Sequence, residues 1–286
     1  MRLASVEIGG NEVAAVVWAG VALPVAEIPN PDGWPTDLFS LLEGGRLDDL
    51  RRRWEGLSER ELEDLAVRAV PDRDLSYAPL YRRPRKIWGI GLNYAEHAGD
   101  LDEKAPAEEP ASFMRPDTTI IGPGDEILLP EGVGRVTVEA ELAVVIGREA
   151  RNVTEGEAPS FVAGFTTVLD VTAEDILRRN PRYLTRAKSF DTFFSFGPEL
   201  LTTDEVDDVG ALEVSTVLNG EVRRANTVSN MTFSPWWLVA FHSRVMRLLP
   251  GDVISTGTPG AVVIREDDVA ECRISGFEPL ANPVVR

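Results

Sequence analysis

The pattern of hydrophobic and polar positions changes near residue 80. The first part of the chain has two short apolar runs around a turn, typical of a β-hairpin, and then segments with a helical period. The hairpin runs are residues 3–8 and 13–18 around Gly9-Gly10-Asn11, and the helical segments are residues 36–42, 47–54 and 59–66. Ser58 and Glu61 have the spacing of a capping box. The stretch 71–84 has no clear period and predicts a linker, so we expect a small N-terminal α+β domain at residues 1–80.

From Lys86 onward, short β-rich runs alternate with Gly/Pro turns. These runs are residues 87–90, 126–129, 136–146, 161–169 and 212–218. Asn219-Gly220 is a strong hairpin signal, and one long helix is predicted from Ser234-Pro235 to about Leu248. Because regular helices do not separate the strands, the pattern disfavours a doubly wound sheet or a TIM barrel. Residues 81–286 therefore predict a second domain, and the whole chain a mixed α/β fold that is mostly β.

Composition narrows the class of protein. Of 286 residues, 43% are hydrophobic, but no segment approaches the apolar length that a membrane helix needs. An acid and a Gly-Gly pair interrupt the N-terminal apolar residues, so we expect no signal peptide there. We expect a cytoplasmic protein without a membrane partner. The net charge of −18 disfavours nucleic-acid binding. The excess of acids is explained by a solvated surface or by adaptation to high salt. Adaptation to high salt or a GC-rich genome would explain why only three of the 29 basic residues are lysine.

Cysteine usage limits the metal chemistry. Cys272 is the single cysteine, so an internal disulfide and a thiolate metal cluster are excluded. Its β-rich surroundings indicate a buried core residue. A metal ion would therefore rely on oxygen or imidazole ligands.

Glu139 and Glu141 lie two positions apart in the run 136–146. In a strand, such residues point to the same face, which places two like charges side by side. A solvent-facing polar stripe is one explanation. The run continues without alternation as Leu142 to Ile146, however, which indicates a strand buried on both faces, where a pair of carboxylates requires a cation.

A third acid, Asp170, is predicted at the end of the strand that begins near Phe165. Such a residue can simply cap the short helix opened by Glu174 and Asp175. Three carboxylates together suit Mg²⁺ or Mn²⁺, which prefer hard oxygen ligands.

The two histidines have different surroundings. His97 is followed by Asp100, which one helical turn would place beside the imidazole, as in a general base that activates water. A surface His-Asp pair is the alternative. His242 lies among aromatic residues in the long helix and is interpreted as a packed core histidine.

Basic residues and one turn are candidates for binding an anionic substrate. Arg115 follows Phe113-Met114, and Lys188 lies in an otherwise apolar segment, where it could instead neutralise Asp191. The turn that contains Gly257 and Thr258 presents backbone N–H groups and hydroxyls, which can cradle a carboxylate.

Taken together and in this order, these segments resemble the fumarylacetoacetate hydrolase family, over about residues 84–286. The segments that carry the resemblance are residues 91–97, 113–116, 139–147, 169–173, 188–191, 197–198, 219–220 and 251–259. The resemblance implies a mostly β catalytic domain with a β-roll or distorted barrel, usually dimeric. It implies one Mg²⁺ or Mn²⁺ ion on Glu139, Glu141 and Asp170.

The resemblance also assigns roles to single residues. It implies that His97 belongs to a lid over the substrate, that Lys188 lies near the substrate and metal, and that Thr258 binds a carboxylate. Many relatives carry arginine where this chain has Glu174, which places the identity of the substrate in doubt; Arg178 or Arg179 could compensate. Arg115 replaces the usual lysine and keeps the charge.

The leading hypothesis is hydrolysis of a C–C bond in a 2,4-dioxo acid such as an acylpyruvate, with His97 and Asp100 activating water and Lys188 neutralising developing charge. Decarboxylation, tautomerisation or dehydration of a small 2-oxo acid through the same metal-bound enolate stays open. A non-catalytic small-acid binding protein is the alternative from another class.

Overall fold

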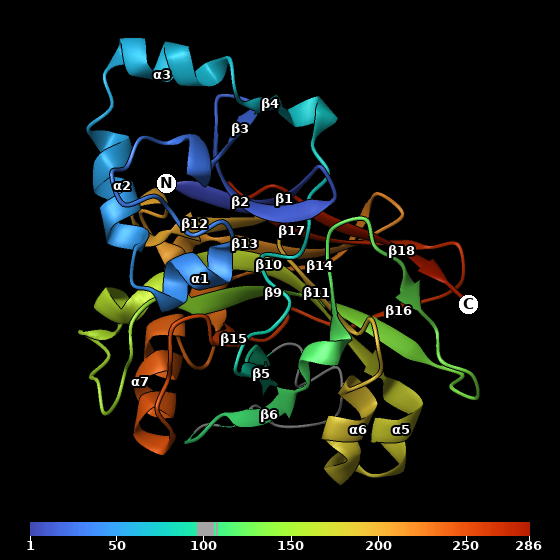
Figure 1. The fold of residues 1–286 in the computed structure, drawn as a ribbon. Helices are drawn as coiled ribbons and strands as arrows, with labels where there is room; N and C mark the ends of the chain where they lie inside the picture. The colour runs from blue at the N-terminus through green and yellow to red at the C-terminus, as the bar shows by residue number, and fades with distance from the viewer. Residues whose placement is uncertain (96–105, 107) are drawn as a thin grey trace.

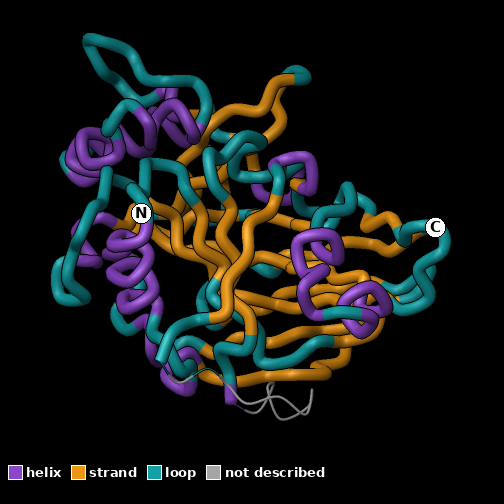
Figure 2. The backbone as a smooth tube through the Cα atoms, turned by 90° about the horizontal axis from the view of Figure 1, so that it is seen from below, coloured by secondary structure: helices purple, strands orange, loops and turns teal. Residues whose placement is uncertain are grey.

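The computed structural model describes residues 1–95, 106 and 108–286 (Figure 1). Over these residues, two β-sheets form the centre of the molecule and the helices lie around them (Figure 2). The prediction of a mixed, mostly β fold is confirmed, and the sheets of the described part stay open rather than closing into a barrel. Among the same residues, none of the helices is both long and apolar enough to cross a bilayer.

The large sheet has 13 described strands, with the main order β4-β3-β2-β1-β12-β10-β9-β15-β5-β6. Its strands are β1 (Arg2–Ile8), β2 (Asn11–Trp18), β3 (Val21–Pro24), β4 (Val70–Pro71), β5 (Ile87–Gly91), β6 (Ala111–Arg115), β7 (Ile120–Ile121), β9 (Val136–Ile146), β10 (Val162–Ala173), β11 (Phe194–Phe196), β12 (Glu199–Thr202), β15 (Val253–Ser255) and β16 (Val262–Ile264).

The smaller sheet has five described strands, in the order β14-β13-β17-β18-β8. They are β8 (Ile127–Leu128), β13 (Glu213–Leu218), β14 (Glu221–Thr227), β17 (Val269–Ile274) and β18 (Leu280–Val285). The α-helices of the described residues are α1 (Leu38–Glu43), α2 (Leu47–Glu55), α3 (Glu59–Ala66), α5 (Glu174–Arg179), α6 (Leu184–Lys188) and α7 (Pro235–Val245). In Figure 1, α1–α3 lie on one side of the large sheet, whereas α5 and α6 lie next to each other at the lower right, where α6 contacts β6.

The antiparallel pair β9–β10 is the centre of both cores. Even-numbered residues of β9, from Val136 to Ile146, belong to the core between the two sheets. On the opposite face, Ala143 and Val145 pack in a second core with the N-terminal elements. This arrangement explains why the apolar run of β9 does not alternate, since both faces are covered. The odd positions 137–141 are the polar part of that second face.

The N-terminal elements pack directly against the large sheet. Strand β1 pairs antiparallel with β12, so that Leu3 lies opposite Leu200. The segment predicted as a linker also makes tertiary contacts, because Leu80 and Tyr81 are buried and the Tyr81 hydroxyl donates to the carbonyl of Gly251 at 3.0 Å. The division of the chain at residue 80 stays a prediction about domains.

Several local predictions are confirmed. Ser58 and Glu61 form the capping box of α3, and Ser234 caps α7 through the N–H of Trp237. Asn219 starts the turn of the β13–β14 hairpin with a positive φ of 54°. Cys272 and His242 are buried, as expected for core residues.

The position predicted for Asp170 was wrong in one respect. Strand β10 continues to Ala173, so Asp170 lies inside the strand and not at its end. Helix α5 begins after Ala173 without a side-chain cap. Asp170 therefore does not cap this helix, and its side chain points from the same strand face as the neighbouring polar positions.

Candidate metal centre

Three acidic side chains converge at the middle of the β9–β10 pair. Asp170 on β10 lies directly opposite Glu139 on β9, and Glu141 follows two residues along on the same face. One carboxylate oxygen from each of the three lies within 4.8 Å of the other two. Glu141 and Asp170 are buried, and the Glu139 side chain is 12% exposed. The convergence predicted from the sequence is therefore present in the fold.

Two cationic side chains reach these acids. The Lys188 ammonium at the end of α6 lies 2.7 Å from Glu139 Oε2 and 2.7 Å from Asp170 Oδ1. The Arg115 guanidinium donates to Asp170 Oδ1 and to the carbonyl oxygens of Lys188, of Phe193 at 3.0 Å and of Val171 at 3.2 Å. Among the described residues, three carboxylates face two cations, so these five groups carry one excess negative charge when all are ionised.

An aromatic ring supports the two cations. The Lys188 Nζ lies 4.9 Å from the centre of the Phe113 ring, and the Arg115 guanidinium lies 5.6 Å from it. The ring rests on Gly89 in the neighbouring strand β5, where an added Cβ would come within 2.2 Å of the ring. Glycine at position 89 is thus required for this ring to lie under the cations.

Glu141 is held by hydrogen-bond donors other than Lys188 and Arg115. Its Oε2 accepts a hydrogen bond from Ser255 Oγ at 2.5 Å and one from the Gly257 N–H at 2.9 Å. Burial, with the neighbouring carboxylates Asp170 and Glu139, raises the pKa of Glu141 to about 8. Lys188 and the Ser255 hydroxyl oppose this shift.

Burial and opposite charges have opposing effects on the pKa values of Asp170 and Lys188. Burial raises the pKa of Asp170, and the adjacent Arg115 and Lys188 reduce the shift without cancelling it. For Lys188, burial lowers the pKa, but Asp170 and Glu139 outweigh burial, so its pKa is raised and the ammonium stays charged.

The residues present fit a divalent cation. Asp170 Oδ2 is buried and accepts no hydrogen bond within the described residues. A buried carboxylate oxygen without a donor is costly unless a cation compensates it. Three carboxylates that converge and supply hard oxygen ligands, with an excess negative charge, are typical of a Mg²⁺ or Mn²⁺ site that retains water ligands.

The remaining predicted site residues differ in how far the structure describes them. His97 and Asp100 lie outside the described residues, so their catalytic role stays a prediction. Thr258 is buried, and its hydroxyl makes hydrogen bonds with Gly260 in its own turn. The Gly257 N–H is directed to Glu141. The substrate-binding roles of Arg115, Gly257 and Thr258 stay predictions.

Glu174 is tied into an ion-pair network. It receives hydrogen bonds from Arg135 and, at 2.9 Å, from Nε of Arg178. Asp175, the next residue, accepts from the backbone N–H groups of Gly134 and Arg135 at 2.8 Å. Arg178 is therefore already paired with Glu174, which neutralises part of its positive charge.

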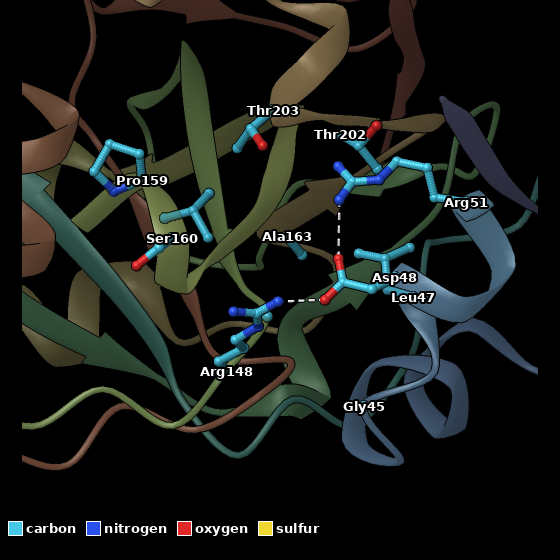
Figure 3. Close-up of a pocket in the computed structure, with 12 residues that line it drawn as sticks. Gly45, Leu47, Asp48, Arg51, Arg148, Pro159, Ser160, Ala163, Thr202 and Thr203 are labelled. Carbon is cyan, nitrogen blue, oxygen red and sulfur yellow. Dashed lines mark hydrogen bonds and ion pairs between the residues drawn. The ribbon is translucent and has the colours of Figure 1, made fainter. Parts of the chain in front are cut away.

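A separate hollow of about 210 Å³ lies between α2 and the loops that follow β9 and β12 (Figure 3). Its two arginines are already paired, because Arg51 contacts Asp48 at 3.1 Å and Asp204 at 3.0 Å, and Arg148 contacts Asp48. Because both arginine charges are already neutralised by these acids, we assign no reaction to this hollow.

Sequence reasoning missed the contact between Ser255 and Glu141. Strand β15, which carries Ser255, pairs antiparallel with β9, and Ser255 lies opposite Ala143. Because this pairing joins residues far apart in the sequence, no local pattern reveals it. The neighbouring Gly257 and Thr258 were singled out, but as groups for a substrate.

Comparisons with known proteins identify the family of this chain. The model of the fumarylacetoacetate (FAA) hydrolase C-terminal domain matches residues 86–285. The mitochondrial oxaloacetate tautomerase Fahd2a of Rattus norvegicus is 34% identical over 224 residues, which cover 76% of this chain and 71% of the relative.

Two solved structures extend the likeness to the whole chain. The 5-carboxymethyl-2-hydroxymuconate delta-isomerase of Mycobacterium smegmatis is 31% identical with a TM-score of 0.78, over 100% of this chain and 99% of that one. The maleylpyruvate hydrolase of Sphingobium sp. SYK-6, in complex with manganese (II) ion and pyruvate, is 27% identical with a TM-score of 0.81 and the same coverage. The chain belongs to the fumarylacetoacetate hydrolase family.

Proposed function

We propose that this chain is a Mg²⁺- or Mn²⁺-dependent hydrolase that cleaves a C–C bond in a 2,4-dioxo acid of the acylpyruvate type. The observation that carries the proposal is the convergence of Glu139, Glu141 and Asp170 within 4.8 Å, with Asp170 Oδ2 buried and without a hydrogen-bond donor among the described residues. The similar structure that is described with manganese (II) and pyruvate supports both the metal and the 2-oxo acid.

The bound cation would supply Lewis acidity toward the carboxylate and 2-oxo oxygens of the substrate. Glu139, Glu141 and Asp170 would hold it. Lys188, which is charged and 2.7 Å from two of these acids, would place its ammonium where negative charge develops on the substrate.

The proton transfer would belong to His97, oriented by Asp100. The imidazole would accept a proton from the water that attacks the 4-carbonyl carbon. The C3–C4 bond would then break, its electron pair would pass to the pyruvate fragment, and a proton would complete pyruvate. The other product is the carboxylic acid formed from the acyl group and water.

The test is release of pyruvate from an acylpyruvate, followed with a coupled dehydrogenase. We expect turnover with Mg²⁺ or Mn²⁺, and loss of turnover after chelation and in Glu141→Ala. The variant Glu199→Gln, at a buried acid paired with Arg2 away from the cluster, is the control for loss of a carboxylate. Turnover that survives both chelation and Glu141→Ala would reject the proposal.

Tautomerisation of oxaloacetate is the second candidate, supported by the relative named oxaloacetate tautomerase. It exchanges a proton between carbon and oxygen and needs no attacking water. Absorbance of the enol form follows this reaction directly, while pyruvate and CO₂ measured together report decarboxylation. Replacing His97 should abolish hydrolysis, whereas decarboxylation, which needs little beyond the cation, should persist. Tight binding of a 2-oxo acid without any turnover would favour a binding protein instead.

A further inference from the structure

The turn that follows β15 is directed at a side chain of the protein itself. Ser255 Oγ, at the end of β15, and the Gly257 N–H, in this turn, both donate to the same atom, Glu141 Oε2, at 2.5 and 2.9 Å. All three residues are buried. A glutamate side chain has several rotatable bonds, and one beside two other carboxylates is also repelled by them. Something must therefore fix its position.

We propose that Ser255 is a positioning residue for Glu141, which would bind the metal: with the Gly257 N–H it holds Oε2 and so fixes how the carboxylate would face a bound cation. The inference rests on the proposed function, because it assumes a divalent cation at the carboxylates. It assigns to this turn a role in the metal centre that is separate from any contact with the substrate.

The two donors are themselves rigid. Ser255 belongs to β15, which is paired on both sides, with Ala143 opposite it on β9 and Gly89 on β5. The next residue, Thr256, donates from both its N–H and its hydroxyl to the carbonyl of Leu142, at 3.0 and 2.7 Å. Since Leu142 directly follows Glu141, the turn is attached to the same strand that carries the metal ligand.

The direction of the Gly257 N–H depends on having glycine at this position. Gly257 has a φ of +99°, which other residues rarely adopt, and an added Cβ would lie 2.9 Å from Asn93 Cβ. Asn93 is buried, and its amide donates to the carbonyls of Thr256 at 2.8 Å and Phe233 at 3.0 Å. The turn is thus held from two directions before any cation binds.

Groups that orient a metal ligand usually change metal affinity by about 10- to 100-fold when they are removed. We therefore expect the dissociation constant for Mn²⁺ to rise by about that factor in Ser255→Ala, measured on the metal-free full chain by calorimetry and by the electron paramagnetic resonance signal of free Mn²⁺. Ser243→Ala is the matched control, because Ser243 is also a buried serine that donates at 2.8 Å to Ala240 and accepts at 3.0 Å from Val153.

A second pair of variants separates the hydroxyl from its surroundings. Ser255→Thr and Ser255→Val add side chains of the same shape, and only threonine can donate to Glu141. We expect Ser255→Thr to bind Mn²⁺ more tightly than Ser255→Val, whatever crowding the two share.

The outcomes are distinguishable. If the wild-type chain binds Mn²⁺ and Ser255→Ala binds it equally well, or if the threonine and valine variants do not differ, this inference fails and the proposed function stands. If the wild-type chain binds no Mn²⁺, the proposed function fails, and the positioning role fails with it. A loss of affinity in Ser243→Ala as large as that in Ser255→Ala would also overturn the inference.

Discussion

Lys188 lies between Glu139 and Asp170, 2.7 Å from each, and compensates part of their charge. Breaking a buried pair by removing one partner costs about 3–5 kcal/mol. We expect Lys188→Met to lower the melting temperature of the metal-free protein. Because Mn²⁺ would replace the missing charge, we also expect Mn²⁺ to raise the melting temperature of Lys188→Met more than that of the wild type. Differential scanning fluorimetry with and without Mn²⁺ measures both effects.

The control for this prediction is Lys86→Met. Lys86 contacts the buried Asp252 at 2.6 Å, away from the acidic cluster. Its replacement should lower the melting temperature without changing the response to Mn²⁺. An equal Mn²⁺ response in wild type and Lys188→Met would contradict the role given to Lys188.

His242 should make the protein sensitive to acid. It is buried against Trp88 and Phe241, neither ring nitrogen has a hydrogen-bond partner in the described structure, and burial lowers its pKa to about 4. The unfolded chain has a pKa near 6.5, so it binds this proton first as the pH falls. His242 therefore removes stability between pH 6.5 and about 4, at up to about 1.4 kcal/mol for each pH unit.

The variant His242→Phe tests this sign. Relative to wild type, its free energy of unfolding should increase as the pH falls below 6.5, and the difference should be constant above pH 7. Urea denaturation at a series of pH values provides the measurement. Parallel stability curves for the two proteins would show that His242 does not titrate in this way.

Individual residues could be predicted where their spacing decides geometry. Glu139 and Glu141 share a strand face because they are two residues apart, and Asp170 comes from the next long strand. The contacts of Ser255 with Glu141 and of Arg115 with Asp170 join strands that the sequence does not show to be neighbours. These partners become visible only in the fold.

At the scale of elements, β9 was predicted with its observed bounds, because an uninterrupted β-branched run of that length has few alternatives. Strand β10 extends to Ala173, beyond the end predicted at Leu169. Asp170 and Thr172 are polar, but the strand is buried throughout, so these two residues do not mark its end. Polar residues look like a strand end when the tertiary contacts that bury them are not yet known. The local capping signal at Ser58 needed no tertiary information.

Gly164 controls how β10 meets β12. An added Cβ would lie 2.0 Å from the carbonyl oxygen of Leu201, a backbone atom that cannot turn aside. We expect Gly164→Ala to destabilise the protein by about 3 kcal/mol, because β12 and the β1 strand paired with it must move. Urea denaturation measures the loss.

The matched control is Gly156→Ala. An added Cβ at Gly156 has no atom within 4 Å, so the free energy of unfolding should stay within about 0.5 kcal/mol of wild type. Equal stability of the two alanine variants would show that β12 does not constrain position 164.

At the scale of the molecule, the N-terminal elements and the β9–β10 pair share one large sheet and one core. The sequence predicted the hairpin β1–β2 from its turn but not its pairing with β12, because register between distant strands leaves no local pattern. The cytoplasmic location and the dimer stay predictions from composition and from the family resemblance.

The proposed function requires that three carboxylates from two paired strands hold one divalent cation. The most direct measurement is a calorimetric titration of the metal-free chain with Mn²⁺, repeated with Glu139→Gln and with Glu199→Gln as the control. We expect one Mn²⁺ per chain, a loss of affinity of more than about 100-fold in Glu139→Gln, and no change in Glu199→Gln. A wild-type chain that binds no Mn²⁺, or a Glu139→Gln variant that binds it as tightly as wild type, would show that these carboxylates do not hold the cation.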